Sequence, residues 1–291
     1  MSPRIHLQKI LPEPGRESGS SFHLSMGIIN ITPDSFFDGG CWNDREGLAA
    51  RVDELRAMDI LDIGAESTAP KSLPIGTHLE YARFQDLGVA NDPWDSRPLS
   101  IDTYHLETFR MLQDRFAPRP LILNDIGGHL DRRLADLLRR TPRCPYIFCH
   151  NLAPTREESS RHMDFPYRGT KGELSDHLAN YFFKAYAFWE RHGLQNPLIF
   201  DPGFGFSKTY EYNWHLLDVF EKFVERFPRR QSWLIGLSKK SFLQRKALET
   251  GEDIGGLHRG LIARLRRNLP RHTLIFRLHD PKDWVDDRAL S

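Results

Sequence analysis

Short apolar runs alternate with amphipathic stretches along most of this chain, and this alternation restricts the folds open to it. Eight largely apolar runs occur, at residues 24–29, 60–63, 98–101, 121–123, 146–149, 198–200, 233–236 and 273–276. Short runs of this kind, bounded by polar residues, are typical of strands that are covered on both faces. We therefore predict eight buried strands.

Between these runs, apolar residues recur every three or four positions, which is the spacing of one face of a helix. Four such sets are Leu48, Val52 and Leu55; Leu134, Leu137 and Leu138; Leu178, Phe182, Tyr186 and Trp189; and Leu217, Phe220, Val224 and Phe227. Strands that alternate with helices predict a single (β/α)8 barrel, the TIM barrel. An open doubly wound sheet is the alternative. It would require a glycine-rich fingerprint after the first strand, and no G-x-G-x-x-G follows Ile29.

The same pattern divides the 291 residues into two parts. Residues 1–21 carry prolines, glycines and serines without a period, so we expect an N-terminal arm there. We expect residues 22–291 to form the barrel as one domain.

Charge and composition restrict the partners. Forty basic and 39 acidic residues give a formal net charge of +1, so no global field attracts nucleic acid or an anionic membrane. We expect small-molecule substrates instead. The chain shows neither a membrane-spanning apolar stretch nor a signal pattern, and three unevenly spaced cysteines argue against a disulfide framework. A cytoplasmic protein with reduced thiols is therefore expected.

Polar and charged residues gather where the predicted strands end. The first run, for example, passes at Asn30 into a loop rich in Thr, Asp and Gly. In a barrel of this type the carboxyl ends of the strands build the site. The residues at or near those ends are Asn30, Asp62, Asp102, Asn124, His150, Asp201, the Ser-Lys-Lys-Ser turn at 238–241, and Arg277 with His279. Carboxylates and amides dominate the first six ends, and cations gather at the last two.

The two groups of side chains predict two halves of a ligand. Acceptors and an amide suit a flat, nitrogen-rich heterocycle, and they come from Asp102, Asn124 and Asp201. Charge-assisted donors suit an anion such as phosphate, and they come from Lys240, Arg277 and His279. A helix that begins after Lys240 would add backbone N–H groups. Together these residues predict a heterocycle with a phosphate-bearing arm.

Each residue also has a simpler interpretation. Asp62 and Asp102 could be N-caps of helices. Asn124 and the Asp-Pro-Gly at 201–203 could form turns, and His150 could satisfy local hydrogen bonds. The joint pattern favours a site, because independent turn residues would not produce it.

Seven segments, in order from about residue 24 to the C-terminus, resemble dihydropteroate synthases. They are MGIINITPDSFFDGG at 26–40, LDIGAEST at 61–68, SIDTY at 100–104, LNDIGG at 123–128, DPGFGFSKT at 201–209, GLSKKSF at 236–242 and RLHD at 277–280. The resemblance implies a TIM barrel that joins 6-hydroxymethyl-7,8-dihydropterin pyrophosphate to 4-aminobenzoate, with Mg²⁺, to give 7,8-dihydropteroate. Members of this family are often dimers, so a homodimer is implied as well.

The resemblance also implies roles for single residues. The pterin ring would be held by Asp102, Asn124, Asp201 and Lys240, and Asp62 and Thr68 would be further substrate-binding residues. Asn30, Arg277 and His279 would bind pyrophosphate and its metal, with Asn30 as the metal ligand. Asn30, Lys240, Arg277 and His279 would be the catalytic residues. The loops at 32–40 and 67–76 would close over the site and form the aminobenzoate pocket with Ser241.

Two departures from the family pattern occur in one loop. The usual Ser-Thr-Arg-Pro-Gly reads Ser-Thr-Ala-Pro-Lys at 67–71, and the adjoining Gly-Gly reads Gly64-Ala65. A lysine two positions on does not replace a bidentate arginine, so we expect reduced turnover or altered use of the second substrate. Two alternatives remain: a non-catalytic pterin-binding homologue, and a methyltransferase on the same barrel that uses methylated folate or pterin with a corrinoid partner.

Overall fold

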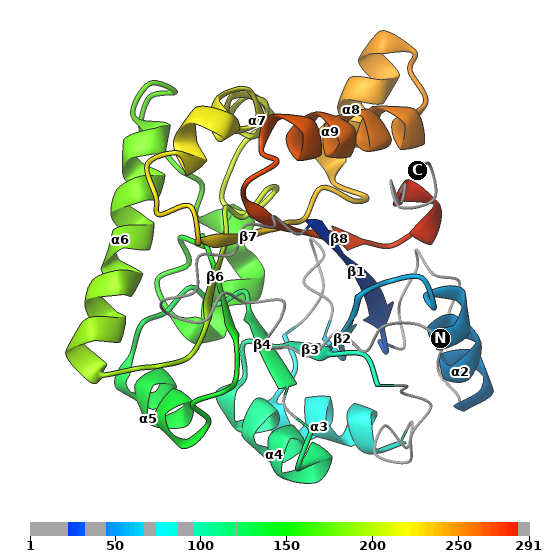
Figure 1. Cartoon of the computed structure of the whole chain (residues 1–291), viewed down its shortest axis with the longest axis vertical. Helices are drawn as coiled ribbons and strands as arrows, with labels where there is room; N and C mark the ends of the chain where they lie inside the picture. Colours follow the sequence, from blue (N-terminus) through cyan, green and yellow to red (C-terminus); the bar gives the residue numbers. More distant parts are fainter. Residues whose placement is uncertain (1–22, 33–44, 67–73, 87–95, 120, 285–291) are drawn as a thin grey trace.

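The computed structural model describes residues 23–32, 45–66, 74–86, 96–119 and 121–284. Within them, eight parallel strands close into a barrel in the order of the sequence (Figure 1). The strands are β1 (His23–Asn30), β2 (Ile60–Gly64), β3 (Leu99–Asp102), β4 (Leu121–Asp125), β5 (Tyr146–Cys149), β6 (Leu198–Asp201), β7 (Ser232–Ile235) and β8 (Thr273–Leu278). The predicted (β/α)8 barrel is confirmed, and the open doubly wound sheet is wrong.

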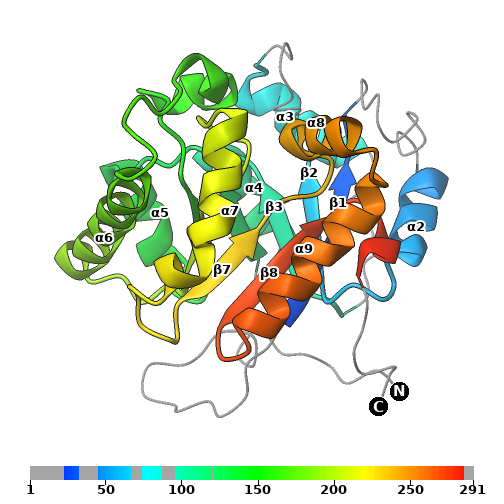
Figure 2. The ribbon, with the colours of Figure 1, turned by 90° about the horizontal axis from the view of Figure 1, so that it is seen from above.

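Helices follow the strands and surround the barrel (Figure 2). They are α2 (Arg45–Glu54), α3 (Thr77–Asp86), α4 (Leu106–Phe116), α5 (Arg132–Arg140), α6 (Leu174–His192), α7 (Tyr210–Val224), α8 (Ser241–Thr250) and α9 (Ile254–Asn268), with short 3-10 helices η1 (Arg156–Asp164) and η2 (Pro281–Asp283). The expected N-terminal arm, 1–21, lies outside the described residues, so the division into arm and barrel stays a prediction.

The strands carry two apolar layers because successive side chains point to opposite faces. Outward-facing residues such as Phe200 and Trp233 pack under the helices. Inward-facing residues meet in the lumen as a second cluster, made by Leu24, Met26, Ile60, Ile122, Ile147, Ile199, Leu234 and Ile275. Each of the eight is buried to at least 95%, so the barrel is filled rather than open.

The polar site residues occupy the next inward-facing position on each strand, nearer its carboxyl end than the apolar cluster. The next inward position on a strand is two residues further on. Two residues beyond the cluster residues of β2, β4, β5, β6 and β8 stand Asp62, Asn124, Cys149, Asp201 and Arg277. The strand period therefore places carboxylates, an amide and a guanidinium on a shared level, toward the carboxyl ends.

Two further expectations concern thiols and membranes. Cys144 and Cys149 are free and buried, as reduced thiols should be, while Cys41 lies outside the described residues. No helix in the described part of the chain has the length and apolar character needed to cross a membrane.

Candidate active site

Three side chains from β2, β4 and β8 meet above the apolar cluster. Arg277 donates from Nε to Asp62 Oδ2 at 2.6 Å, and Asn124 donates from Nδ2 to both Asp62 oxygens at 3.2 Å. The Asp62 side chain is fully buried, and Arg277 is its ion-pair partner. A buried carboxylate needs such partners because it has left water.

Arg277 also reaches β3. Its Nη2 lies 2.5 Å from Asp102 Oδ2. Burial raises the pKa of Asp102 to about 7, although the positive charge of Arg277 opposes the rise. Two of the residues predicted to hold substrate are thus tied to one predicted to hold pyrophosphate. The halves expected from the sequence therefore touch, with Arg277 between them.

The N-cap interpretation of Asp62 and Asp102 is wrong. Asp62 lies inside β2, and helix α3 begins only at Thr77. Asp102 is the last residue of β3, and the N-cap of α4 is His105. Both carboxylates are side chains of the barrel strands.

Asp201 ends β6 and takes part in a turn as well. Its Oδ1 accepts the backbone N–H of Gly203 at 2.7 Å, so the turn interpretation and the lumen position both hold. Burial raises the pKa of Asp201. Gly203 has φ of +66°, and a Cβ there would stand 2.4 Å from the carbonyl oxygen of His150. Only glycine allows the chain to turn here, just above the carboxylate.

A buried lysine that sequence reasoning assigned no role holds this turn. The Nζ of Lys208 donates to the carbonyls of Gly203 and Phe206 at 3.0 and 3.1 Å. The same atom lies 2.9 Å from Nδ1 of His150. Lys208 is 1% exposed, and burial lowers its pKa from 10.5 to about 7. Lysine is rarely fully buried, so its place inside DPGFGFSKT gave no signal that it faces inward.

His150 links Lys208 to the surface. Its Nε2 lies 3.1 Å from Nε2 of His177, a half-buried residue of α6. The expectation that His150 satisfies local hydrogen bonds is confirmed. Burial and the charge of Lys208 lower the pKa of His150, so the ring stays neutral.

Lys240, the cation that follows the seventh strand, lies against the aromatic ring of Phe206. Lys240 is the N-cap residue of α8, as its sequence position predicted, and its Nζ lies 4.6 Å from the ring centroid of Phe206. The His162 ring stacks on Phe206 at 3.9 Å, and burial lowers its pKa to about 3. Ser241, the first residue of α8, follows Lys240 and is exposed. Nothing in the sequence indicated that His162 would join this group.

His279 stands one residue past β8 as a neutral ring. Its backbone N–H donates to Ser238 Oγ at 3.2 Å, and its Nδ1 lies 3.0 Å from the same oxygen. Burial, followed by the positive charge of Arg277, lowers the pKa of His279 to about 2. Asn30 ends β1, in register with Gly64 of β2.

The second loop is described only at its two ends. Glu66 accepts from the Tyr104 hydroxyl at 2.6 Å and from Ile75 N–H at 3.2 Å. Its other oxygen lies 3.0 Å from Nε2 of His105. Glu66 therefore fastens both ends of the loop. Thr68, Ala69 and Lys71, and the first loop from 33 to 40, lie outside the described residues, so their predicted roles stay predictions.

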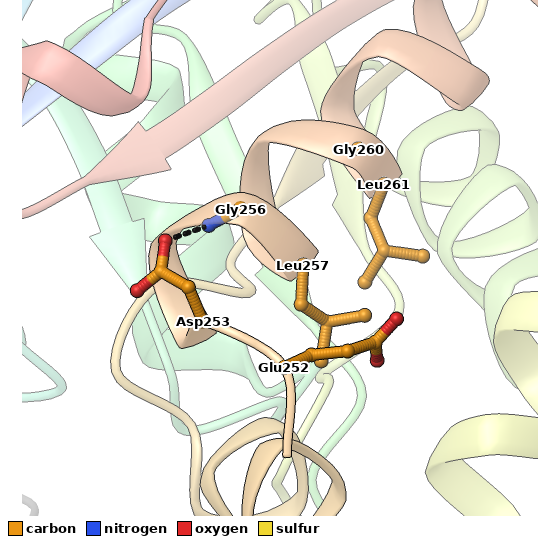
Figure 3. Close-up of a pocket in the computed structure, with 6 residues that line it drawn as sticks. All are labelled: Glu252, Asp253, Gly256, Leu257, Gly260 and Leu261. Atoms are coloured by element: carbon orange, nitrogen blue, oxygen red, sulfur yellow. Dashed lines mark hydrogen bonds between the residues drawn. The ribbon is translucent and has the colours of Figure 1, made fainter. Parts of the chain in front are cut away.

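A hollow of about 410 Å³ lies elsewhere, at the start of α9 (Figure 3). It is lined by Glu252, Asp253, Gly256, Leu257, Gly260 and Leu261. Its Asp253 caps the helix by accepting from Gly256 N–H at 2.7 Å. The hollow thus lacks the converging titratable groups of the barrel mouth, and we regard the mouth as the site.

A closed (β/α)8 barrel with carboxylates, an amide and cations at its carboxyl ends defines a small-molecule enzyme of the TIM-barrel class. A family model described as pterin binding enzyme matches residues 26–265. Dihydropteroate synthase of Streptococcus pyogenes serotype M6 is 30% identical over 269 residues, which cover 91% of this chain and 93% of that protein. The chain belongs to the pterin-binding enzyme family, among the dihydropteroate synthases.

Solved structures agree. Dihydropteroate synthase of Xanthomonas albilineans with 4-aminobenzoic acid superposes with a TM-score of 0.68 at 28% identity, covering 92% of this chain and 91% of that one. Some relatives are longer. The chain spans 65% of the bifunctional dihydropteroate synthase/dihydropteroate reductase of Helicobacter pylori and 55% of a folate synthesis bifunctional protein of Arabidopsis thaliana.

Proposed function

We propose that this protein is a dihydropteroate synthase. It would join 6-hydroxymethyl-7,8-dihydropterin pyrophosphate to 4-aminobenzoate and release 7,8-dihydropteroate and pyrophosphate. The observation that carries the proposal is the contact of Arg277 with Asp62 and Asp102, because it brings a phosphate-binding group against carboxylates that suit a pterin.

The pterin would lie over the polar level of the lumen. Carboxylates accept hydrogen bonds from ring N–H and amino groups, and an amide both donates and accepts. Asp102, Asn124 and Asp201 offer these groups within the barrel mouth, and Lys240 would donate to a ring oxygen or nitrogen. Asp62 would act mainly through Asn124 and Arg277, which it already holds.

The reaction exchanges one bond at the pterin methylene for another. The C–O bond to pyrophosphate breaks with its electron pair leaving on oxygen, and the aniline nitrogen forms a C–N bond and then loses a proton. Arg277 and neutral His279 would hold the leaving group by donated hydrogen bonds, since charge builds up there in the transition state. The electron-rich pterin ring would stabilise the methylene cation.

The second substrate would lie beside Phe206. An aromatic plate next to Lys240 and the N-terminus of α8 suits an aryl carboxylate, because the ring can stack while the anion meets positive charge. Ser241 and Thr68 would contribute from α8 and the second loop. Closing loops would keep water from the methylene cation.

Magnesium fits this donor set in a limited way. Among the described residues no group of three or more His, Cys, Asp or Glu side chains could hold a metal ion. Mg²⁺, however, is often bound by few protein oxygens together with substrate phosphates and water, and Asn30 at the end of β1 would supply one oxygen. Bound there, the ion would neutralise charge on pyrophosphate.

We also propose that the enzyme is cytoplasmic and forms a homodimer.

The test is a coupled assay of pyrophosphate release. We expect release only when both substrates are present, and growth of a thymidine-requiring, synthase-deficient host that carries the gene. Tight pterin binding without release would favour the non-catalytic homologue. Methyl transfer to a corrinoid protein would favour the methyltransferase.

A further inference from the structure

Arg51, on α2, is a buried arginine that bonds mainly to the backbone. It is 4% exposed. Its Nη2 donates to the carbonyl oxygen of Ile28 at 3.0 Å and to that of His279 at 2.5 Å. Its Nη1 donates to Glu54 at 2.6 Å. One planar group thus joins α2 to the first and last strands of the barrel.

The two carbonyls lie where the first and last strands part. β1 and β8 lie side by side (Figure 1). Their register ends at the pair Gly27 and Leu278. Ile28 is the next residue of β1, and His279 is the first residue after β8. Buried carbonyls need donors, and Arg51 supplies them one residue beyond the end of the ladder. The guanidinium therefore bridges β1 and the end of β8 beyond their last paired residues, on the side of the site. We call this junction of β1 and β8 the barrel seam.

The seam lies directly below two residues assigned to pyrophosphate. Asn30 follows Ile28 by two positions, and His279 is itself a partner of Arg51. The charge of Arg51 also reaches the site, since it contributes, after burial, Arg277, Lys239 and Lys240, to the lowered pKa of the His279 ring. Arg51 is thus connected to this subsite by backbone contact and by charge.

We propose that Arg51 is a positioning residue for the pyrophosphate leaving group. Its rigid fork keeps the ends of β1 and β8 at a fixed separation, so that Asn30 and His279 can address the same anion. Its positive charge stands behind them and favours that anion further. This inference rests on the proposed function, because it assumes that pyrophosphate lies at this strand end.

Arg97 provides a matched control. It donates from Nη1 to the carbonyl of Leu55 at 2.5 Å and from Nη2 to that of Val52 at 3.2 Å. Like Arg51, it joins two carbonyls with one guanidinium and supports α2. Neither partner belongs to β1 or β8, so Arg97→Met should affect stability without affecting pyrophosphate.

The experiment compares Arg51→Met, Arg51→Lys and Arg97→Met in the full chain. Titration calorimetry measures dissociation constants for Mg-pyrophosphate with 6-hydroxymethylpterin bound, and for 6-hydroxymethylpterin alone. We expect Arg51→Met to weaken pyrophosphate binding about tenfold or more, because the variant removes both the positive charge behind the anion and the fork that spaces the two strand ends, with pterin binding changed less than about twofold. Arg51→Lys should lie between, because it keeps the charge but not the fork.

The outcomes are distinguishable. Equal weakening of both ligands, no change in either, or the same pattern in Arg97→Met would overturn the inference and leave Arg51 a structural residue. If Arg51→Met fails to fold, Arg51→Lys carries the same comparison. Absence of pyrophosphate binding in the unmodified protein would instead overturn the proposed function.

Discussion

Arg277 and Asp62 are 215 residues apart in the sequence, and their side chains lie 2.6 Å apart in the barrel lumen. Arg277 comes from β8 and Asp62 from β2, the two strands on either side of β1. The arginine that the resemblance gives to pyrophosphate is therefore oriented by a carboxylate that it gives to substrate. Because Asp62 is fully buried and Arg277 is partly buried, each protects the other from being an unpaired charge.

Removing one partner of this pair should destabilise the fold. We expect Asp62→Ala to lower the free energy of unfolding by about 3 kcal/mol, because it removes the fully buried carboxylate that Arg277 and Asn124 bond and leaves Asp102 to pair with the guanidinium. Urea unfolding followed by circular dichroism measures this. The exposed i,i+4 pair Arg110–Asp114 on α4 is the control, and Asp114→Ala should cost at most about 0.5 kcal/mol. Equal costs for the two variants would contradict a special role for Asp62.

Pterin binding should weaken as the pH falls through 7. Burial raises the pKa of Asp102 to about 7, and protonation converts one of its two acceptor oxygens into an O–H donor that opposes the N–H groups of the ring. Below pH 7 the proton must leave before the ring binds, so affinity should fall up to about tenfold per pH unit. Titration calorimetry at several pH values between about 5.5 and 8.5, which bracket the pKa of Asp102, measures the dissociation constant of the pterin. Asp102→Asn should bind more weakly with a flatter profile; an unchanged slope would show that another group titrates.

Lys208→Met should loosen the turn after β6. The change removes the ammonium donor from the carbonyls of Gly203 and Phe206. The Gly203 carbonyl keeps the backbone N–H of Phe206 at 2.9 Å, so the main cost is about 1–3 kcal/mol for the buried Phe206 carbonyl left unpaired. Since Phe206 is the proposed plate for 4-aminobenzoate, KM for this substrate should rise more than the dissociation constant of the pterin. Steady-state kinetics and calorimetry separate the two effects.

The same variant tests the pKa of Lys208. Burial lowers this pKa from 10.5 to about 7, so between these values the unfolded chain binds more protons than the folded one. Stability contributed by this group therefore rises with pH from 7 to 10.5 and is lost as the pH falls through that window. Unfolding at several pH values should show this slope in the unmodified protein and a smaller one in Lys208→Met. Parallel curves would show that folding does not lower the pKa of Lys208.

Restoring the family arginine should raise turnover. The loop reads Ala69 where the family usually has arginine, and a planar guanidinium holds an anion by two bonds where a lysine cannot. We expect Ala69→Arg to raise kcat/KM for pyrophosphate release, and Lys71→Ala to lower it if the lysine compensates. Turnover that is indifferent to both changes would show that this loop position does not limit the reaction.

Sequence reasoning predicted the fold well because it used local signals. The strand runs, the helical spacings and the beginning of α8 after Lys240 are each written within a few residues. The sequence also predicted most of the polar residues of the lumen, because the carboxyl end of a barrel strand can be identified from the apolar run itself. The apolar runs predict Asp62 and Arg277 at the ends of their strands, yet the two residues lie within β2 and β8.

What it missed depends on contacts between distant segments. Lys208 and Arg51 look like ordinary surface cations in the sequence, and nothing local indicates that the chain folds over them. His162 occurs in a polar stretch and meets Phe206 only because η1 packs against the turn after β6.

The sequence by itself thus determined the barrel and the residue types at its mouth, because hydrophobic period and strand length are local properties. Only the tertiary structure decided which of these residues touch. The register of strands around the closed barrel sets which side chains share a level, and burial then selects partners for every charge, as Asp62 does for Arg277 and two backbone carbonyls do for Arg51.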